Sequence, residues 1–339
     1  MIANHAVPVV VDAYLKGFKG FSPEDAYNAI KASLTVSHKK SDWETYDKYG
    51  YYPFDITTVE SVSRTLESAY DDYCAAQMAK AMGKDKDYEF FMKRASAYKS
   101  LFDPGTKLMR GKDSKGKWRF PFNPFLLSHA ASCGGDYTEG NAWQYTWHVQ
   151  HDVAGLMGGK ESFAMKLDSL FMLDTIAENT GFVSDVSGFI GQYAHGNEPS
   201  HHVVYLYNYV DQPWKTQELI PEIFERFYKP KPGGLCGNDD CGQMSAWYIF
   251  SSMGFYPVDP ISGEYVLGAP QMDKISIQLT EDRAFVVEAK NLSRKNKYVK
   301  SVELNGKPVR GLTIKHEDIM SGGHLVFTMT DEPVKRVLK

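Results

Sequence analysis

Residues 233–258 read GGLCGNDDCGQMSAWYIFSSMGFYPV. Within this stretch the composition changes from glycines and acids to bulky apolar and aromatic residues. Four glycines lie between positions 233 and 242, around the adjacent acids Asp239 and Asp240. Bulky apolar and aromatic residues follow them, namely Met244, Trp247, Tyr248 and Phe250. An exposed turn has no need of this combination. The stretch therefore predicts a loop that carries carboxylates and packs against the start of a helix.

The part of the chain before this stretch is predicted to be helical. Apolar residues recur at helical spacing in roughly nine segments, among them PVVVDAYLKGF, SPEDAYNAIKASL and SVSRTLESAYDDYCAAQMAKAMG. Ser22 suits an N-cap and Pro23 the first helical position, while Gly83 is a stop signal. Long loops separate alternate helices, as a toroidal helical barrel requires. Residues 1–257 are thus predicted to form a mainly α domain.

The part after residue 258 is predicted to be made of strands. The segments EYVLGAP, KISIQLT, AFVVEAK, YVKSVELNGKPV and GHLVFTM alternate apolar and polar residues, and Asn305-Gly306 is a strong hairpin signal. About five strands make a poor sandwich alone. We therefore expect residues 258–339 to supply β-sandwich strands that pair with strands outside this chain or remain a partly open sheet.

Composition excludes two classes of partner. The 38 basic and 42 acidic residues give a net charge of -4, and no Lys/Arg-rich run is present, so nucleic-acid binding is not expected. No run of about 18 apolar residues occurs, so no transmembrane segment is expected. The N-terminus is amphipathic and lacks the basic leader of a signal peptide.

Four cysteines are too few for a disulfide scaffold. Cys236 and Cys241 lie on either side of the Asn-Asp-Asp loop. A small disulfide clasp and two reduced thiols in a packed turn are both compatible with this spacing.

Three junctions between a loop and a helix carry acids among glycines, amides and aromatics. Glu139 precedes the helix predicted from NAWQYTWHVQHDVAGLMG, Glu198 lies in GNEPSHH, and Asp239 and Asp240 follow Asn238 in the opening stretch. Helix N-termini favour negative charge, so each acid taken alone is explained as a cap. The three together indicate glycosidic cleavage, in which one carboxyl protonates the leaving oxygen and another activates water or attacks.

The donor types favour a hard cation over zinc. Carboxylate and amide oxygens suit Ca²⁺, whereas the zinc patterns HExxH and paired CxxC are absent. His201 and His202 are adjacent and would point about 100° apart on a helix, so they cannot easily share a metal. Neither GxSxG nor a P-loop is present.

The blocks TEGNAWQYTWHVQHDVAGL, GNEPSHHVVYLYNYVDQPWKTQ and GNDDCGQMSAWYIFSSMGFYPV closely resemble the signature blocks of glycoside hydrolase family 92. The resemblance extends over essentially the whole chain. It implies an exo-acting, inverting, Ca²⁺-dependent α-mannosidase, frequently α-1,2-specific. The family fold is an N-terminal β-sandwich joined to an (α/α)6 barrel, with C-terminal strands returning to the sandwich. Six hairpins need twelve helices, so we expect an incomplete (α/α)6 toroid here, without the family's N-terminal half.

The resemblance also implies roles for single residues. Glu139 is the candidate general acid, Asp240 the candidate general base and Asp239 the neighbouring acid of the same motif. Relatives often carry Gly-Asp-Glu-Asp in this loop, so Asn238 puts a two-carboxylate activation of water in doubt. The predicted substrate-binding residues are Glu198, Asn238, Trp143 and His195, and the predicted calcium ligands are Gln144 and Asn197.

The implied substrate is a mannose-containing oligosaccharide or a glycoprotein glycan, and the implied location is periplasmic or secreted. The missing N-terminal half of the enzyme is an expected partner. Two alternatives remain open. In the first, the chain is a catalytically incomplete fragment or a non-catalytic carbohydrate-binding remnant of such an enzyme. In the second, it is another (α/α)6 enzyme, such as a polysaccharide lyase. A lyase would use a Tyr/His pair such as Tyr145 and His148.

Overall fold

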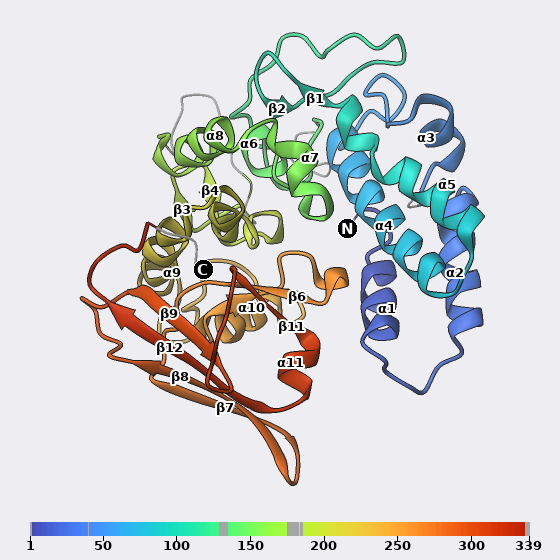
Figure 1. Cartoon of the computed structure of the whole chain (residues 1–339). Coiled ribbons are helices and arrows are strands. Elements are labelled where there is room, and N and C mark those ends of the chain that lie inside the picture. Colours follow the sequence, from blue (N-terminus) through green and yellow to red (C-terminus); the bar gives the residue numbers. More distant parts are fainter. Residues whose placement is uncertain (1, 40, 129–134, 175–182, 184–185, 336–339) are drawn as a thin grey trace. The chain divides into compact units, whose positions relative to one another are not determined.

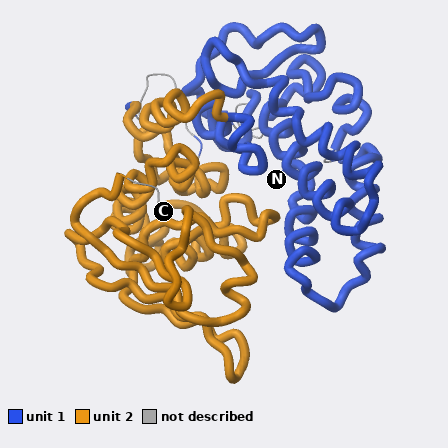
Figure 2. The backbone as a smooth tube through the Cα atoms, in the orientation of Figure 1, with its two compact units in different colours: residues 1–156, 174–186 blue, residues 157–173, 187–339 orange. Residues whose placement is uncertain are grey.

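The computed structural model describes residues 2–39, 41–128, 135–174, 183 and 186–335. Contacts divide the chain into two compact units (Figure 2). Unit 1 consists of Met1–Leu156 and Asp174–Val186, and unit 2 consists of Met157–Leu173 and Ser187–Lys339. The boundary that we predict near residue 258 lies within unit 2 and stays a prediction, as does the (α/α)6 ring.

Unit 1 is built around one long helix, α4 (Ser61–Ala81), most of whose residues are buried. Helices α1, α2 and α5 pack against it (Figure 1). The predicted cap of α2 is confirmed, because Ser22 Oγ accepts a hydrogen bond from the backbone N–H of Asp25 and Pro23 begins the helix. The elements of this unit are α1 (Ala6–Leu15), α2 (Pro23–Thr35), α3 (Trp43–Tyr49), α5 (Asp85–Ala95), η1 (Ala97–Ser100), β1 (Phe102–Asp103), β2 (Leu108–Met109), α6 (Ala142–Tyr145) and η2 (Gln150–Asp152). Helix α7 (Val153–Met157) follows at the boundary between the units.

The single helix predicted for residues 141–158 is wrong, because the segment is divided into α6, η2 and α7. Thr146 Oγ1 donates to the carbonyl of Ala142 and accepts from the backbone N–H of Met109. The backbone of Val149 then leaves the helical region, with φ −138° and ψ 45°. A threonine hydroxyl that bonds to nearby backbone competes with helix continuation, and here it also ties the segment to β2.

The helical part of unit 2 follows the sequence prediction in position but not always in type. SHHVVYLYNYV is another of the segments predicted to be helical, and its residues Val203–Val210 form a 3-10 helix rather than an α-helix, with β-branched valines at the start. The elements before the sheets are α8 (Lys160–Met172), β3 (Phe189–Ile190), β4 (Tyr193–Ala194), η3 (Glu198–Ser200), η4 (Val203–Val210), α9 (Pro213–Phe227), α10 (Gln243–Ser252) and η5 (Pro260–Ser262).

The predicted C-terminal strand region is confirmed. A five-stranded sheet has the order β10-β9-β12-β8-β7, and a three-stranded sheet has the order β11-β6-β5 (Figure 1). In the larger sheet β12 is parallel to β8 and antiparallel to β9. The elements are β5 (Phe255–Tyr256), β6 (Glu264–Leu267), β7 (Lys274–Thr280), β8 (Arg283–Lys290), β9 (Tyr298–Leu304), β10 (Lys307–Pro308), β11 (Thr313–Lys315), α11 (His316–Met320) and β12 (Gly323–Thr330).

The core of this region joins both sheets. Its buried residues include Phe255 and Leu267 from the small sheet and Phe285, Val302 and Phe327 from the large one. Inward-facing residues alternate along β8 and β12, as expected for strands with one buried face. The sheet core is therefore a continuous apolar layer.

The predicted hairpin is also confirmed. It joins β9 to β10 through Asn305 and Gly306, both with positive φ. Asn and Gly adopt this left-handed conformation more readily than other residues, which is why the dipeptide is a hairpin signal.

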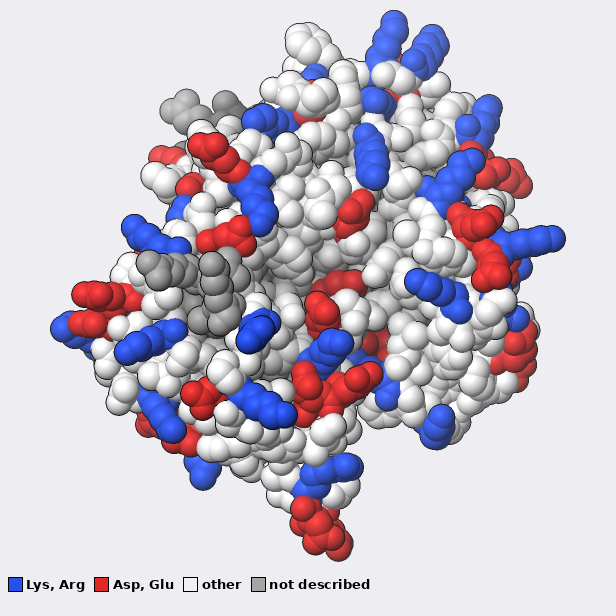
Figure 3. All heavy atoms as spheres, viewed as in Figure 1, with Lys and Arg blue, Asp and Glu red and all other residues white. Residues whose placement is uncertain are grey.

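Acidic and basic side chains are interspersed over the face of the molecule that Figure 3 shows. Among the helices in the part of the chain that the structure describes, none has the length and apolar character needed to span a bilayer.

We expect Phe285→Ala to lower the free energy of unfolding by about 3–5 kcal/mol, because it removes a fully buried ring and leaves a cavity. Urea unfolding measures the change. The matched control is Phe18→Ala, since the Phe18 side chain is 65% exposed and its loss should cost little. Equal unfolding midpoints for the two variants would show that the sheet core does not depend on Phe285.

Candidate active site

In unit 1 the segment that leads to Glu139 is anchored at the N-terminus of α4. The carbonyl of Asp136 accepts from the backbone N–H groups of Val62 and Ser63 at 2.9 and 3.2 Å, and its carboxylate accepts from Ser61 Oγ at 2.9 Å. The first N–H groups of a helix have no partner within the helix, and this end favours negative charge. Asp136 therefore completes the start of α4 from a distant part of the chain.

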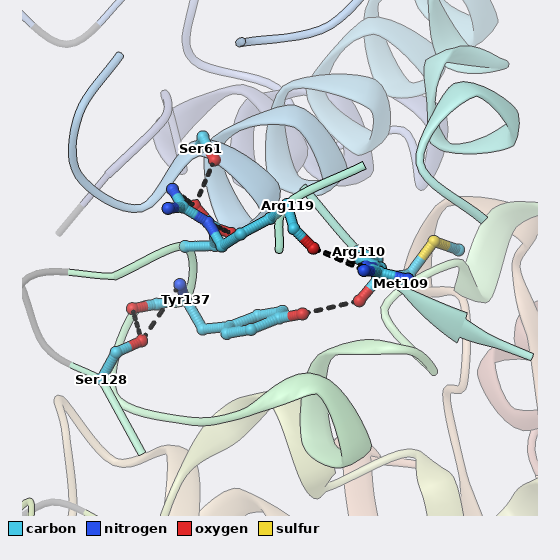
Figure 4. A network of polar contacts seen from close by, with 7 residues as sticks. Ser61, Met109, Arg110, Arg119, Ser128 and Tyr137 are labelled. Atoms are coloured by element: carbon cyan, nitrogen blue, oxygen red, sulfur yellow. Dashed lines mark hydrogen bonds and ion pairs between the residues drawn. The ribbon is translucent and has the colours of Figure 1, made fainter. Parts of the chain in front are cut away.

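The Asp136 carboxylate is further held by Arg119, which contacts both of its oxygens (Figure 4). The backbone of Gly111 lies so close that a Cβ there would be 2.5 Å from Asp136 Oδ2. A buried carboxylate with an arginine fork and a serine hydroxyl has its charge and geometry satisfied. The segment 135–137 is thus fixed in place.

Tyr137 continues the anchor (Figure 4). Its phenol donates to the carbonyl of Met109 at 2.6 Å, and its backbone exchanges hydrogen bonds with Ser128 Oγ. Burial raises the pKa of Tyr137 well above its ordinary value, so the phenol remains a donor. Gly140 pairs with the backbone of Ser128 in both directions.

Glu139 lies between these anchors, half-buried and with φ +48°. The preceding residue, Thr138, donates its backbone N–H to Ser63 Oγ at 2.9 Å, and the following residue, Gly140, is paired with Ser128. A left-handed backbone at a residue other than glycine is uncommon and is kept only where the surroundings hold it. The contacts of Thr138 and Gly140 therefore hold the backbone that carries the Glu139 carboxyl.

Helix α6 begins two residues later with a capping box. Asn141 Oδ1 accepts from the N–H groups of Trp143 and Gln144, and Gln144 Oε1 accepts from the N–H of Asn141 at 2.9 Å. The predicted calcium ligand Gln144 is therefore buried with its amide oxygen engaged in the cap. The predicted substrate-binding residue Trp143 is buried and stacks with Phe125, ring centroid to ring centroid at 6.1 Å.

In unit 2 the structure brings two of the predicted blocks into backbone contact. A Cβ on Gly237 would lie 2.4 Å from the carbonyl oxygen of Gly196, so only glycine permits this approach. Gly196 is followed by Asn197 and Glu198, and Gly237 is followed by the Asn238–Asp240 loop. The side chain of Asn197 is buried, whereas Glu198 is half-buried. This contact brings the start of the block with Asn197 and Glu198 against the start of the loop that carries Asp240.

The two adjacent acids differ in their surroundings. Asp239 Oδ1 accepts from the backbone N–H and the hydroxyl of Ser245 at 2.9 and 3.0 Å, so this carboxylate caps the start of α10. Asp240 is exposed, and the backbone is left-handed at Asp240, Cys241 and Gly242, with φ of 46°, 56° and 93°. The backbone therefore turns sharply between Asp239 and the start of α10.

His195, predicted to bind substrate, is fully buried under this loop. Its Nδ1 lies 2.7 Å from the Tyr193 phenol and its Nε2 lies 2.9 Å from the Tyr228 phenol. Because Tyr228 donates its own proton to the carbonyl of Met244, it accepts from Nε2 and leaves Nδ1 to accept from Tyr193. The ring joins β4 to the first turn of α10, and its role in substrate binding stays a prediction.

His201 is the second buried imidazole under the loop. Its Nε2 lies 2.9 Å from the carbonyl of His195, and its Nδ1 lies 3.1 Å from Gln243 Nε2. One donor and one acceptor describe a neutral ring. Burial lowers the pKa of His201 to about 4, although the charge of Asp240 acts in the opposite direction.

Cys236 and Cys241 are free thiols, so the reading as reduced cysteines holds and the clasp is absent. Burial raises the pKa of the Cys236 thiol to about 11, which makes it a poor nucleophile.

Within the described ranges no cluster of three or more His, Cys, Asp or Glu side chains could hold a metal ion.

Sequence reasoning missed the residues that hold the Glu139 loop, above all Asp136, Arg119 and Ser63. It also missed Glu67, whose carboxylate accepts from the Tyr145 phenol at 3.0 Å. Asp136 lies three residues before Glu139, so its closeness to the acid could have been inferred from the sequence. Ser63 and Glu67 are polar residues on a helix that is buried along most of its length. A polar side chain on an otherwise buried helix was the signal that could have pointed to Ser63 and Glu67.

Comparison with known proteins connects these loops to a family. Residues 1–331 match the sequence model of the glycosyl hydrolase family 92 catalytic domain. The fold is similar to that of a family GH92 α-mannosidase from Bacteroides thetaiotaomicron solved with mannoimidazole, with a TM-score of 0.94 and 46% identity over 100% of this chain and 45% of that chain. A family GH92 inverting mannosidase from the same organism has a TM-score of 0.88 and 36% identity over 100% of this chain and 47% of that chain.

A curated relative from Arthroderma benhamiae, described as an uncharacterized secreted glycosidase, is 27% identical over 369 aligned residues. The alignment covers 97% of this chain and 45% of that protein. The chain therefore spans less than half the length of each of these three relatives.

The buried neutral His201 makes stability depend on pH. Its pKa is about 4 in the folded state and about 6.5 when unfolded, so the unfolded chain binds the proton first as the pH falls. The stabilisation present above pH 6.5 is lost between about pH 6.5 and 4, by up to about 3 kcal/mol from this group.

We therefore expect His201→Gln to flatten the decline of the free energy of unfolding over this pH range, measured by urea unfolding at several pH values. The control His38→Gln replaces an exposed imidazole and should keep the wild-type slope. A wild-type slope in His201→Gln would contradict the assignment of a neutral buried ring.

Proposed function

The chain belongs to glycosyl hydrolase family 92, and from this premise we propose that it carries out, within the whole protein, the release of terminal mannose from α-mannosides. The observation that carries the proposal is the match over 100% of this chain to a protein named as an α-mannosidase, at 46% identity. We propose hydrolysis by single displacement with inversion, because a second relative of 36% identity is named as an inverting mannosidase.

We assign the general acid to Glu139. Protonation of the leaving oxygen requires a carboxyl in a fixed position that remains protonated until the bond breaks. The left-handed backbone of Glu139, held by Thr138 on one side and Gly140 on the other, meets the first requirement. Strained backbone at a polar residue is a common feature of active sites.

We assign the general base to Asp240 rather than Asp239. Both acids are exposed, but Asp239 Oδ1 accepts two hydrogen bonds from Ser245 and caps α10, whereas Asp240 has a left-handed backbone beyond that cap. A base that activates water has to keep an accessible lone pair. Asn238, which precedes both acids, offers an amide for orienting that water.

The calcium requirement belongs to the same proposal. The buried amide side chains of Gln144 and Asn197 offer the hard oxygen donors that calcium prefers, and an amide oxygen that accepts one hydrogen bond has a second lone pair. When bound, calcium would engage hydroxyls of the terminal mannose and favour a flattened ring. The protein's own residues supply the proton transfers.

The finer features of the proposal rest on the family resemblance. They are a preference for the α-1,2 linkage, a glycoprotein glycan or mannan as substrate, and export from the cell. Export is supported by the relative described as a secreted glycosidase. A panel of α-1,2-, α-1,3- and α-1,6-mannobiosides decides the linkage.

Glu139→Gln and Asp240→Asn should each lower kcat for an α-mannobioside by about 10²- to 10⁴-fold, because each removes one proton transfer. Mannose release is measured on the chain and on a version extended upstream, and NMR identifies the first anomer formed, which inversion requires to be β. The matched controls Glu161→Gln and Asp282→Asn alter exposed carboxylates and should retain activity. Near-normal turnover in Glu139→Gln or Asp240→Asn would remove that residue from its role.

EDTA should abolish mannose release, and added Ca²⁺ should restore it, because the metal acts on the sugar ring itself. The same titration with Mg²⁺ is the control, since Mg²⁺ demands a smaller and more rigid octahedron. Full activity after exhaustive chelation, with metal content checked by elemental analysis, would refute the calcium requirement.

A further inference from the structure

We propose that Tyr145, held by Glu67, is a positioning residue for Glu139. The inference deepens the proposed function and rests on it, because it presumes that Glu139 is the general acid. Neither residue need contact the substrate. Their contribution is to hold the backbone that carries the acid.

Tyr145 is the last residue of α6, and its ring lies against the residue that follows Glu139. A Cβ on Gly140 would be 3.2 Å from two carbons of the Tyr145 ring, so the ring packs directly on this backbone. The Tyr137 ring lies 6.1 Å from the Tyr145 ring, centroid to centroid. The short segment that contains Glu139 is thus bordered by two fixed tyrosines.

The Tyr145 phenol is held by a buried carboxylate. It donates to Glu67 Oε1 at 3.0 Å, and the other oxygen, Glu67 Oε2, lies 2.8 Å from His5 Nε2. Both Tyr145 and Glu67 are buried. Burial and the charge of Glu67 raise the pKa of Tyr145 well above its ordinary value, so the phenol stays a donor. A hydrogen bond from a hydroxyl to a carboxylate is among the stronger kinds in proteins.

Helix α4 links the two sides of the acid loop. Ser63 and Glu67 are four residues apart on α4 and therefore lie on the same face. Ser63 holds Thr138, immediately before Glu139, and Glu67 holds Tyr145 after it. One buried helix thus fixes the acid loop from both ends, and a shift of about 1 Å in a reacting group can cost on the order of 10²-fold in rate.

The test uses the dependence of the reaction on its leaving group. An α-mannobioside needs the acid, because a sugar alkoxide leaves poorly without a proton, whereas 2,4-dinitrophenyl α-mannoside needs little protonation. Tyr145→Phe removes only the hydroxyl. We expect kcat on the mannobioside to fall about 10- to 100-fold, with a change below about 3-fold on the dinitrophenyl substrate and little change in KM.

The matched control is Tyr98→Phe. The Tyr98 phenol also donates to a carboxylate in unit 1, Asp152 Oδ2 at 2.6 Å, and Tyr98 is equally buried. The Asp152 carboxylate is partly exposed, whereas Glu67 is buried, so the control matches the phenol and its acceptor type. If loss of a buried tyrosine's bond to a carboxylate impaired turnover through general loosening, this variant would lose activity on both substrates. We expect it to retain activity on both.

A second variant keeps the proposal falsifiable if Tyr145→Phe folds poorly. Glu67→Met removes the acceptor of the Tyr145 phenol at similar side-chain volume and should show the same selective loss on the mannobioside. The double variant should lose no more than the larger single effect, because both changes break one contact. Circular dichroism and thermal unfolding establish that each variant is folded.

Equal losses on the two substrates, or no loss in a folded Tyr145→Phe or Glu67→Met protein, would overturn the positioning role alone. All variants are compared in the version extended upstream, and a wild-type protein of this extended form that releases mannose from neither substrate would overturn the proposed function and this inference with it. The two failures are therefore distinguishable.

Discussion

A left-handed backbone at an acidic residue is the constraint on which the two acidic loops depend. Glu139 and Asp240 both have it, with φ of 48° and 46°. Such a conformation costs of order 1–3 kcal/mol at a residue with a side chain, so it persists only where neighbouring contacts exceed that cost. In unit 1 those contacts come from α4 and Ser128, and in unit 2 they come from the cap of α10 and the approach of Gly237 to Gly196.

The Glu139 loop and the Asp240 loop are held in their left-handed conformations by different kinds of contact. The Glu139 loop is held by polar contacts that are almost all buried, including an arginine fork on Asp136 and serine hydroxyls of α4. A buried polar network of this kind is stable only when every member is satisfied, and it then specifies one geometry. The Asp240 loop is more exposed. It is held by Ser245 on Asp239, and His201 contacts the side chain of Gln243 at the start of α10.

Much of the fold was readable because its signals are local. Ser22 and Pro23 predicted the start of α2, Asn305-Gly306 predicted the β9–β10 turn, and alternation predicted β8 and β12. The long helix predicted for residues 141–158 failed because Thr146 bonds to β2, a contact that no local pattern contains. Likewise, the adjacent acids Asp239 and Asp240 look equivalent in the sequence, and only the position of Ser245 separates the cap from the proposed base.

By itself the sequence determined the helical and strand regions, the hairpin, the acids at three helix starts and, through its signature blocks, the family. These features depend on residues within a few positions of each other, where periodicity and capping act. Only the tertiary structure decided which residues hold the acids in place. Ser63 and Thr138 are 75 residues apart, and Glu67 and Tyr145 are 78 apart, and each pair meets because α4 is buried beside the loop. Side-chain packing between distant segments sets such contacts, and a linear pattern carries no record of it.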